Sequence, residues 1–556
     1  MKTKITILVF FAICSLHLYS TNYTVTINTD DATANSGSLR DVITRANADA
    51  STPHSISFSG VTSITLTSVL PTISKPMIID GGGTVTIVGF NSASNSMLCA
   101  ATATLHLKDL TFNAAIVSCS GPTTADNCTF TGGTAGILRG SVALTCNGCT
   151  FYGNTNTGAG SAVNGNSSTN DVTLNNCIIR DNGLKTSSAS GGAAICASGG
   201  NATTGSKLTI NNCLIYNNVN YSTGTNYGGA IASGAAITIT NSAIYNNSAN
   251  RGAGITLYAG GASKKSSLTM TGCTVSGNSV ASYAATAVGG GIYIMGVSTG
   301  TYTDNCTFTN CTISGNSTPV IVSPVTSSAG GGIQIGLGSN SVWGTPTFTF
   351  TNCTITGNTV QGNPTGNALA GGGIDMTRGN VVVNYCIVAG NNSNSSSASK
   401  DVFCSTLTST TGRNLYGGTL GWNSSTTTGN VNLSADISTI LNTSLADNGG
   451  TTALPDGTYV QTHALVAGCA AVNPDATGLD ITALRTALSL PINDQRVFSR
   501  DATPDMGAYE YGAISDVHQV IDQKQLFIVK NGIESLVDGT IEVIMRIRSR
   551  DSIIHC

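Results

Sequence analysis

The sequence is poor in charged residues and especially poor in carboxylates. Only 9% of its 556 residues are charged, and no Glu precedes Glu510. Residues 128–391 contain no His, and their carboxylates are Asp171, Asp181, Asp304 and Asp375. Glycoside hydrolysis needs two clustered carboxylates, and calcium-dependent lyase chemistry needs Asp ligands beside a basic residue. The scarcity of acids therefore weighs against both chemistries in this stretch.

Long apolar runs are also scarce. The one strong run, Ile5 to Leu18, follows the basic start Met-Lys-Thr-Lys and precedes small Ser20. This pattern is typical of a signal peptide, so we assign residues 1–20 to one. Cys14 offers the alternative of a lipoprotein signal, but Ile13 is poorly suited to precede a lipidated cysteine. No later run is apolar enough to cross a bilayer, so we expect an exported chain without a transmembrane span.

The overall charge is small. The net charge of −3 gives no electrostatic reason to expect nucleic acid or anionic lipid as a partner.

The sequence does contain a short motif that recurs along the chain. Its clearest copy is Asn310-Cys-Thr-Ile-Ser-Gly-Asn316, and nine copies follow one another at intervals of 21 to 42 residues. Such self-similarity is the signature of a solenoid, in which each repeat buries its apolar face against its neighbours. Apolar residues alternate with a period of two and are interrupted by Gly and Asn corners. We therefore predict an all-β fold, a single-stranded parallel β-helix with three strands and three corners per coil.

Eight cysteines share one position of the repeat. They are Cys128, Cys149, Cys177, Cys213, Cys273, Cys311, Cys353 and Cys386. Stacked parallel strands lie about 4.8 Å apart with their side chains parallel, an arrangement unsuited to disulfides. We therefore expect buried free thiols that pack as small apolar groups, and Ser242 in the same column favours packing over metal binding. Cys146 and Cys149 are then two core positions, not a redox or zinc motif.

An asparagine follows seven of these cysteines, and also Ser242, five residues later, whereas Gly133 takes that place after Cys128. The column comprises Asn154, Asn182, Asn218, Asn247, Asn278, Asn316, Asn358 and Asn391. Stacked amides can hydrogen-bond to one another from coil to coil, so we predict a structural ladder at this corner.

Amphipathic spacing at the start of the chain predicts a cap. Residues 38–47 carry apolar side chains on one helical face, with Ser38 as N-cap and Asp41 in the first turn. We place an N-terminal cap at residues 21–60 and the β-helix at residues 61–410.

Three motifs carry a family resemblance. The repeated Gly-Gly-Ala-Ile and Phe/Ile-x-x-Asn motifs resemble the polymorphic outer-membrane protein repeats, within the pectin-lyase-like superfamily of right-handed parallel β-helices. The opening Gly37-Ser-Leu-Arg-Asp-Val42 is similar to the module that precedes many of these helices. The resemblance covers roughly residues 23–400 and implies a right-handed β-helix. It leaves the function open, because this helix carries lyases, hydrolases and non-catalytic adhesins.

Residues 411–512 carry motifs that differ from those of the repeats. Motifs such as Asp505-Met-Gly-Ala-Tyr-Glu510 resemble the choice-of-anchor module at the end of bacterial surface β-helices. Five of its charged residues are Asp494, Arg496, Arg500, Asp505 and Glu510. We expect them to form ion pairs that pin a loop-rich C-terminal cap over the last coil; the alternative is a catalytic carboxylate cluster.

The tail, residues 513–556, reads as a strand, a turn and a second strand. It resembles the C-terminal sorting domain of Bacteroidetes type IX secretion, but the basic Arg546-Ile-Arg-Ser-Arg550 stands where further strands would be, as in a truncated signal. The resemblances imply a protein that is secreted or associated with the outer membrane of a Gram-negative bacterium.

The third strand of the coil supplies the candidate binding residues. We expect an outward column formed by Thr256, Tyr293, Gln334 and Asp375. Long inserts beside it carry Tyr221, Tyr227 and Tyr283. Exposed aromatic and amide groups on such loops suit contacts with sugar or protein. The alternative is that the inserts are tolerated insertions without a ligand.

Two pairs are the candidates for acid/base chemistry. They are Arg180 with Asp181 and Asp375 with Arg378, and the simpler interpretation of each is a local ion pair. We therefore predict a monomeric, non-catalytic adhesin or glycan-binding scaffold at the cell surface, without metal or cofactor. The alternative is a polysaccharide lyase or glycoside hydrolase acting on a polyuronate, for which calcium would be considered. A passive structural spacer is the third hypothesis.

Overall fold

The structure is a computed structural model that describes most of the chain after residue 20. The described residues are 21–156, 160–165, 171–184, 194–197, 206–220, 227–258, 266–281, 286–295, 305–319, 327–336, 346–361, 371–376, 379–393, 401–404, 407–409, 413–417, 430–433, 435–474, 485–486, 488–513, 529–530 and 533–534. The expected signal peptide lies outside them.

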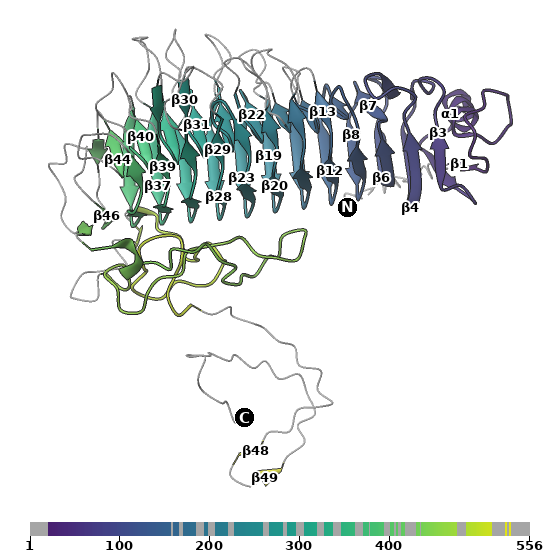
Figure 1. Cartoon of the computed structure of the whole chain (residues 1–556). Coiled ribbons are helices and arrows are strands. Elements are labelled where there is room, and N and C mark those ends of the chain that lie inside the picture. The colour runs from purple at the N-terminus through teal and green to yellow at the C-terminus, as the bar shows by residue number, and fades with distance from the viewer. Residues whose placement is uncertain are drawn as a thin grey trace, which may run out of the picture.

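The chain forms a long stack of short parallel strands (Figure 1). The first strands of the regular coils are β8 (Thr123–Asp126), β11 (Leu144–Asn147), β15 (Val172–Asn175), β19 (Lys207–Asn211), β23 (Ala236–Thr240), β27 (Leu268–Thr271), β32 (Cys306–Thr309), β37 (Thr347–Thr351), β41 (Asn380–Asn384) and β45 (Leu407–Ser409). The second strands are β9 (Thr129–Thr131), β12 (Thr150–Tyr152), β16 (Ile178–Arg180), β20 (Leu214–Tyr216), β24 (Ala243–Tyr245), β28 (Thr274–Ser276), β33 (Thr312–Ser314), β38 (Thr354–Thr356), β42 (Ile387–Val388), β46 (Leu415–Gly417) and β47 (Val431–Leu433).

Two further sheets complete each coil. The third strands are β5 (Asn95–Cys99), β7 (Ile116–Cys119), β10 (Leu138–Gly140), β14 (Val163–Gly165), β18 (Ile195–Ala197), β22 (Ile231–Ser233), β26 (Ile255–Leu257), β31 (Ile292–Ile294), β36 (Ile333–Ile335), β40 (Ile374–Met376) and β44 (Val402–Cys404). Two-residue strands that the sequence did not predict follow the corner Asn: β13 (Thr155–Asn156), β17 (Gly183–Leu184), β21 (Val219–Asn220), β25 (Ser248–Ala249), β29 (Ser279–Val280), β34 (Ser317–Thr318), β39 (Thr359–Val360) and β43 (Asn392–Ser393). Strands β30 (Thr286–Val288) and β35 (Ser327–Ala329) form a small separate pair. The predicted parallel β-helix is confirmed.

The N-terminal end of the stack is covered as expected. Helix α1 (Leu39–Ala48) begins at Ser38, whose side chain accepts a hydrogen bond from the Asp41 backbone N–H at 3.1 Å. Strand β1 (Thr21–Val25) pairs in parallel with β2 (His54–Phe58), so the predicted cap region also contains the first coil of the β-helix. The irregular early coils continue through β3 (Ser63–Thr65), β4 (Met77–Val88) and β6 (Leu105–Asn113).

At the other end, the helix runs further than predicted. Strands β46 and β47 continue the parallel sheet to Leu433, beyond the expected boundary at residue 410. In the tail, β48 (Val529–Lys530) and β49 (Ile533–Glu534) form an antiparallel pair.

The core consists of columns of like residues. Phe130 stacks on Phe112 and Phe151 at centroid distances of 5.1 and 4.8 Å, and Phe308 stacks on Phe350 at 4.7 Å. The repeat cysteines are buried free thiols, and so are Cys146 and Cys149. Dispersion contacts between such identical neighbours stabilise one coil on the next.

The cysteine column has a polar role that the sequence interpretation missed. The thiol of Cys213 donates to the carbonyl oxygens of Asn211 and Leu174 at 3.2 and 3.4 Å, and its sulfur accepts from the Cys177 backbone N–H at 3.3 Å. Ser242 takes the same position in the next coil and accepts from the Cys213 backbone N–H at 3.0 Å. The position thus satisfies backbone groups at a corner, which explains why serine can replace cysteine there.

The asparagine column forms an unbroken buried ladder. From Asn182 onward each Oδ1 accepts from the backbone N–H and from the side-chain amide of the preceding Asn, with amide-to-amide distances of 2.8 to 3.0 Å between Asn154 and Asn391. Asp401 ends the ladder, because its Oδ1 accepts from both nitrogens of Asn391 at 2.7 and 2.8 Å.

Asp401 makes the end of the ladder sensitive to pH. Burial raises the pKa of Asp401 to about 7 from the usual 3.8, although the Asn391 hydrogen bonds oppose the shift. The folded protein therefore holds a proton between about pH 4 and pH 7 that the unfolded chain lacks, and its stability falls as the pH rises through this window.

We expect Asp401→Asn to remove this loss, since Asn keeps the acceptor and carries no charge. At pH 8 the variant should gain roughly 2–4 kcal/mol over the wild type, and at pH 4 the two should be similar. Denaturant unfolding at both pH values checks this. An equal effect of the substitution at pH 4 and pH 8 would contradict a role for ionisation.

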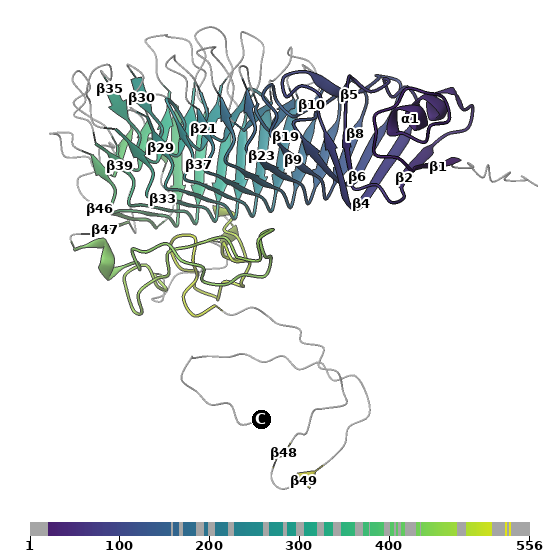
Figure 2. The same cartoon turned by 45° about the vertical axis from the view of Figure 1, so that its right-hand side comes forward.

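Residues 435–513 form a loop-rich module that packs along one side of the helix (Figure 1 and Figure 2). The module contacts the last coils, where Ile437 and Leu441 share an apolar cluster with Leu415 and Val431, and it also extends back along the side of the stack, which was not expected. The module covers outward positions of the second strands, all of them buried: Leu214, Ala243, Thr274, Thr312, Thr354 and Ile387. These outward side chains are apolar or small, which gives the module a surface on which it can bury its own Leu454 and Val460.

Hydrogen bonds fix the register of the module on the coils. Thr274 Oγ1 donates to the Gln461 carbonyl at 2.6 Å, and Ser314 Oγ pairs with His463 Nε2 at 2.7 Å. The corner residues Asn310 and Asn352 donate to carbonyl oxygens of the module at 2.7 and 3.0 Å. The repeat corners therefore hold the module as well as the stack.

Candidate functional site

The predicted column on the third strand exists but is not exposed. Thr256, Tyr293, Gln334 and Asp375 are direct neighbours on β26, β31, β36 and β40. Their exposed fractions are 0%, 1%, 0% and 2%, so the expectation of an exposed column is wrong.

Glycines explain the burial of this column. The backbone that leads into each third strand passes close over the outward side chain of that strand. A Cβ added to Gly289 would lie 2.8 Å from the Tyr293 Cβ, and one added to Gly330 would lie 2.8 Å from the Gln334 Cβ. Both glycines have positive φ, a conformation that favours glycine. The Gly-rich runs are thus needed for the backbone to cross the column closely.

Asp375 is a solitary buried carboxyl group. Its Oδ1 accepts from Gln334 Nε2 and its Oδ2 from the Gly371 backbone N–H, both at 3.2 Å. Burial raises the pKa of Asp375 to about 7, against the effect of these hydrogen bonds. Among the described residues, no cation forms an ion pair with it. Its predicted partner Arg378, like Tyr221 and Tyr283, lies outside those residues.

Three tyrosines and an arginine gather beside the column. The ring of Tyr227 lies 6.4 Å from that of Tyr258 and 6.3 Å from that of Tyr293, and the Arg251 guanidinium lies 5.7 Å from the Tyr227 centroid. Burial raises the pKa of Tyr293 to about 12 and also raises that of Tyr258. Tyr227, Tyr258 and Arg251 are half-buried, so the cluster reaches the surface.

Two buried polar atoms of this region lack hydrogen-bond partners within the described parts of the chain. They are Nε of Arg251 and Oε1 of Gln334. Tyr227, Tyr293 and Gln334 are among the residues predicted from sequence, whereas Arg251 and Tyr258 are not. The available signal was the short connection from β25 to β26, which brings the charged Arg251 directly to the third strand.

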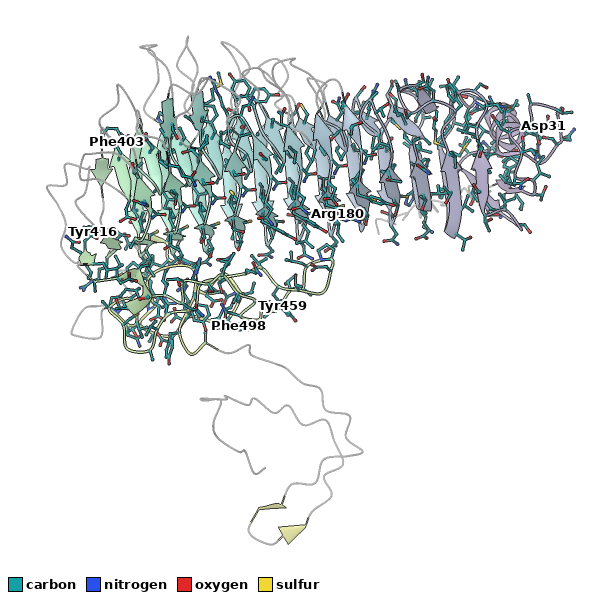
Figure 3. All side chains as sticks on the ribbon, viewed as in Figure 1. Asp31, Arg180, Phe403, Tyr416, Tyr459 and Phe498 are labelled. Carbon is teal, nitrogen blue, oxygen red and sulfur yellow. The ribbon has the colours of Figure 1, made fainter. Side chains whose placement is uncertain are left out.

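The second acid/base candidate is an exposed ion pair. Arg180 Nη1 lies 2.5 Å from Asp181 Oδ2, and the guanidinium stacks 4.8 Å from the Tyr152 centroid. Asp181 occupies a corner with φ of 55°. Figure 3 labels Arg180 on the helix and Tyr459 on the module, which docks beside it. No second carboxylate contacts the pair in the described residues, so its geometry is that of a local salt bridge.

The charged residues of the module are also paired. Arg496 Nη2 lies 2.6 Å from Asp494 Oδ2, and Arg500 Nη1 lies 2.8 Å from Glu510 Oε2, all of them buried. Asp505 accepts from the backbone N–H groups of Asn473 and Tyr511 at 2.7 and 2.6 Å. Every group of the set is thus held by structural contacts, as expected for pinning and not for a carboxylate cluster open to substrate.

The described residues offer no cluster of three or more His, Cys, Asp or Glu side chains placed to hold a metal ion. Among the same residues, no helix has the length and apolarity needed to cross a membrane.

Comparison with known families agrees with the strand geometry. Residues 113–308 match the family model described as a right handed beta helix region. The chain folds as a right-handed parallel β-helix. The match covers the regular coils from the end of β6 into β32, and it indicates that the stack is right-handed. No curated protein matches the chain.

Proposed function

We propose that this β-helix protein is an exported, non-catalytic scaffold that binds a glycan at a cell surface. The observation that supports it is the cluster of Arg251, Tyr227, Tyr258 and Tyr293 beside Gln334. A sugar ring presents C–H groups that pack on aromatic faces and hydroxyls that hydrogen-bond to amides.

The half-buried Arg251 guanidinium favours a ligand at this cluster. It lies over the Tyr227 ring at the surface of the coils. A hydroxyl or carboxylate of a bound glycan could accept a hydrogen bond from it, while the half-buried Tyr227 and Tyr258 rings pack against the sugar. Gln334 is fully buried beside Tyr293 and serves as support for the cluster.

The location belongs to the same proposal. The apolar N-terminal run supports export, and the motifs of the module support attachment at the outer membrane through a choice-of-anchor mechanism. We propose a monomer related to the polymorphic outer-membrane proteins, with a polysaccharide or a host-cell surface as partner.

A glycan array together with a cell-adhesion assay tests this function. We expect the secreted chain to bind a defined group of glycans and to attach to surfaces that display them. Blank results in both assays would refute the proposal.

A polysaccharide lyase or hydrolase is the second candidate, because a carboxyl with a pKa of about 7, such as Asp375, suits proton transfer near neutrality. Incubation with polyuronates, with and without calcium, would reveal unsaturated products or new reducing ends. We expect neither. Turnover that Asp375→Asn abolishes would overturn the non-catalytic function.

A further inference from the structure

A second ordered surface lies on the first strands, away from the tyrosine cluster. Eight threonines occupy the same outward position of consecutive coils in continuous register. They are Thr124, Thr145, Thr173, Thr209, Thr238, Thr269, Thr307 and Thr349. Neighbours along this column are about 4.8 Å apart, the spacing of hydrogen-bonded strands.

A second threonine column runs beside the first in four coils. It contains Thr240, Thr271, Thr309 and Thr351, each two residues after a member of the first column. The two columns are about 6.7 Å apart along the strand. Strands β23, β27, β32 and β37 therefore present a two-dimensional array of hydroxyl and methyl groups.

The array is accessible and uncharged. Thr238, Thr269 and Thr271 are exposed, and the others are half-buried except Thr351, which is buried. The corresponding positions from Asn147 to Thr351 carry only Thr and Asn, with no charged and no aromatic side chain. A charged partner would find no opposite charge in the array. A neutral surface could bind without the cost of removing water from a charged side chain.

The support beneath the array is rigid. The Phe308 and Phe350 rings stack beneath β32 and β37 at an interplanar angle of 6°, and the asparagine ladder runs through the same coils. Thr is β-branched and holds few rotamers on a strand. The hydroxyl and methyl positions are thus fixed before any partner arrives, which reduces the entropy lost on binding.

We propose that the paired threonine columns of β23, β27 and β32, together with Thr349 of β37, bind the surface of ice. The repeat between coils and the repeat along each strand lie near the two oxygen repeats of an ice face. Each threonine can therefore hold a water near a lattice position, and the small gains add up over the array. A crystalline glycan is less well matched, because no aromatic ring stands in these columns to stack on sugars.

Partition into slowly growing ice tests the proposal on the fluorescently labelled full mature chain. We expect the wild type to become enriched in the ice and to inhibit recrystallisation, whereas serum albumin is excluded. Thr269→Tyr should reduce both effects to the albumin level, because a large ring in the middle of the array prevents close approach. Ser279→Tyr, at an exposed strand position outside the array, should behave as the wild type.

Thr238→Lys is the second variant, since an exposed lysine at this edge is compatible with the fold; it should also abolish enrichment. Circular dichroism melting confirms that each variant is folded. Exclusion of the wild type from ice, or full activity of both array variants, would overturn the proposal. Binding to crystalline cellulose or chitin without enrichment in ice would overturn it as well.

Discussion

Replacing Asn316 with Leu is expected to destabilise the helix by on the order of 3–5 kcal/mol, because several buried groups lose their partners together. Asn316 Oδ1 accepts from both nitrogens of Asn278 at 2.9 and 3.0 Å, and its Nδ2 donates to the Val275 carbonyl and to Asn358 Oδ1, both at 2.9 Å. Leucine is similar in size but satisfies none of them. Asn316 lies in the middle of the ladder, so its replacement removes hydrogen bonds from the coils on both sides.

Guanidinium denaturation followed by circular dichroism measures this effect. Asn113→Leu is the matched control, because Asn113 is an exposed asparagine on β6 and its substitution should change stability by less than about 0.5 kcal/mol. If the two variants unfolded at the same denaturant concentration, the ladder would not be a principal support of the stack.

The second large effect is expected from Arg500→Ala, which should release the module from the helix. Arg500 pairs with Glu510 at 2.8 Å and donates to Asn310 Oδ1 on the helix at 3.0 Å. Its removal leaves the buried Glu510 carboxylate without a cation, held only by the backbone N–H groups of Asp501 and Asp505, a loss worth about 3–5 kcal/mol. Protection from hydrogen exchange should fall in β28, β33 and β38, which lie under the module, and remain unchanged in β11 and β15.

Two variants control for this interpretation. Arg485→Ala removes a half-buried arginine that donates to the Asp501 carbonyl, and it should leave exchange at the interface unchanged. The double variant Arg500→Met with Glu510→Leu replaces the ion pair with apolar groups and should restore most of the protection. Loss of protection along the entire helix in Arg500→Ala would show that the module and the stack do not separate as two units.

Periodicity made much of the fold predictable from sequence. Repeated Cys, Ile and Asn identify inward positions and corners, because every coil must solve the same packing and hydrogen-bonding problem. Ser242 in place of Cys and Asp401 at the end of the ladder show that hydrogen-bonding capacity at those places matters more than residue type.

The covered faces could not be predicted in the same way. Alternation shows that Thr274 and Thr354 point outward, but not that a segment beyond residue 435 lies over them. A signal was present in the apolar outward residues Leu214 and Ile387, which a solvated face does not require. The third-strand column was misjudged for another reason: glycine backbones cross it closely, a contact that alternation does not reveal.

The candidate site was therefore only partly predictable. Tyr227 and Tyr293 come from different coils, and Arg251 reaches them because the loop before it is short. Such convergence depends on how the coils are stacked and not on any local motif.

The most direct test of the binding function compares two arginine variants by calorimetric titration with the strongest glycan from the array. Arg251 and Arg180 each stack on a tyrosine, but Arg180 already pairs with Asp181. We predict that Arg251→Ala weakens glycan binding at least tenfold, about 1.4 kcal/mol, and that Arg180→Ala leaves it unchanged. Equal affinities for the wild type and Arg251→Ala would contradict a binding site at the tyrosine cluster.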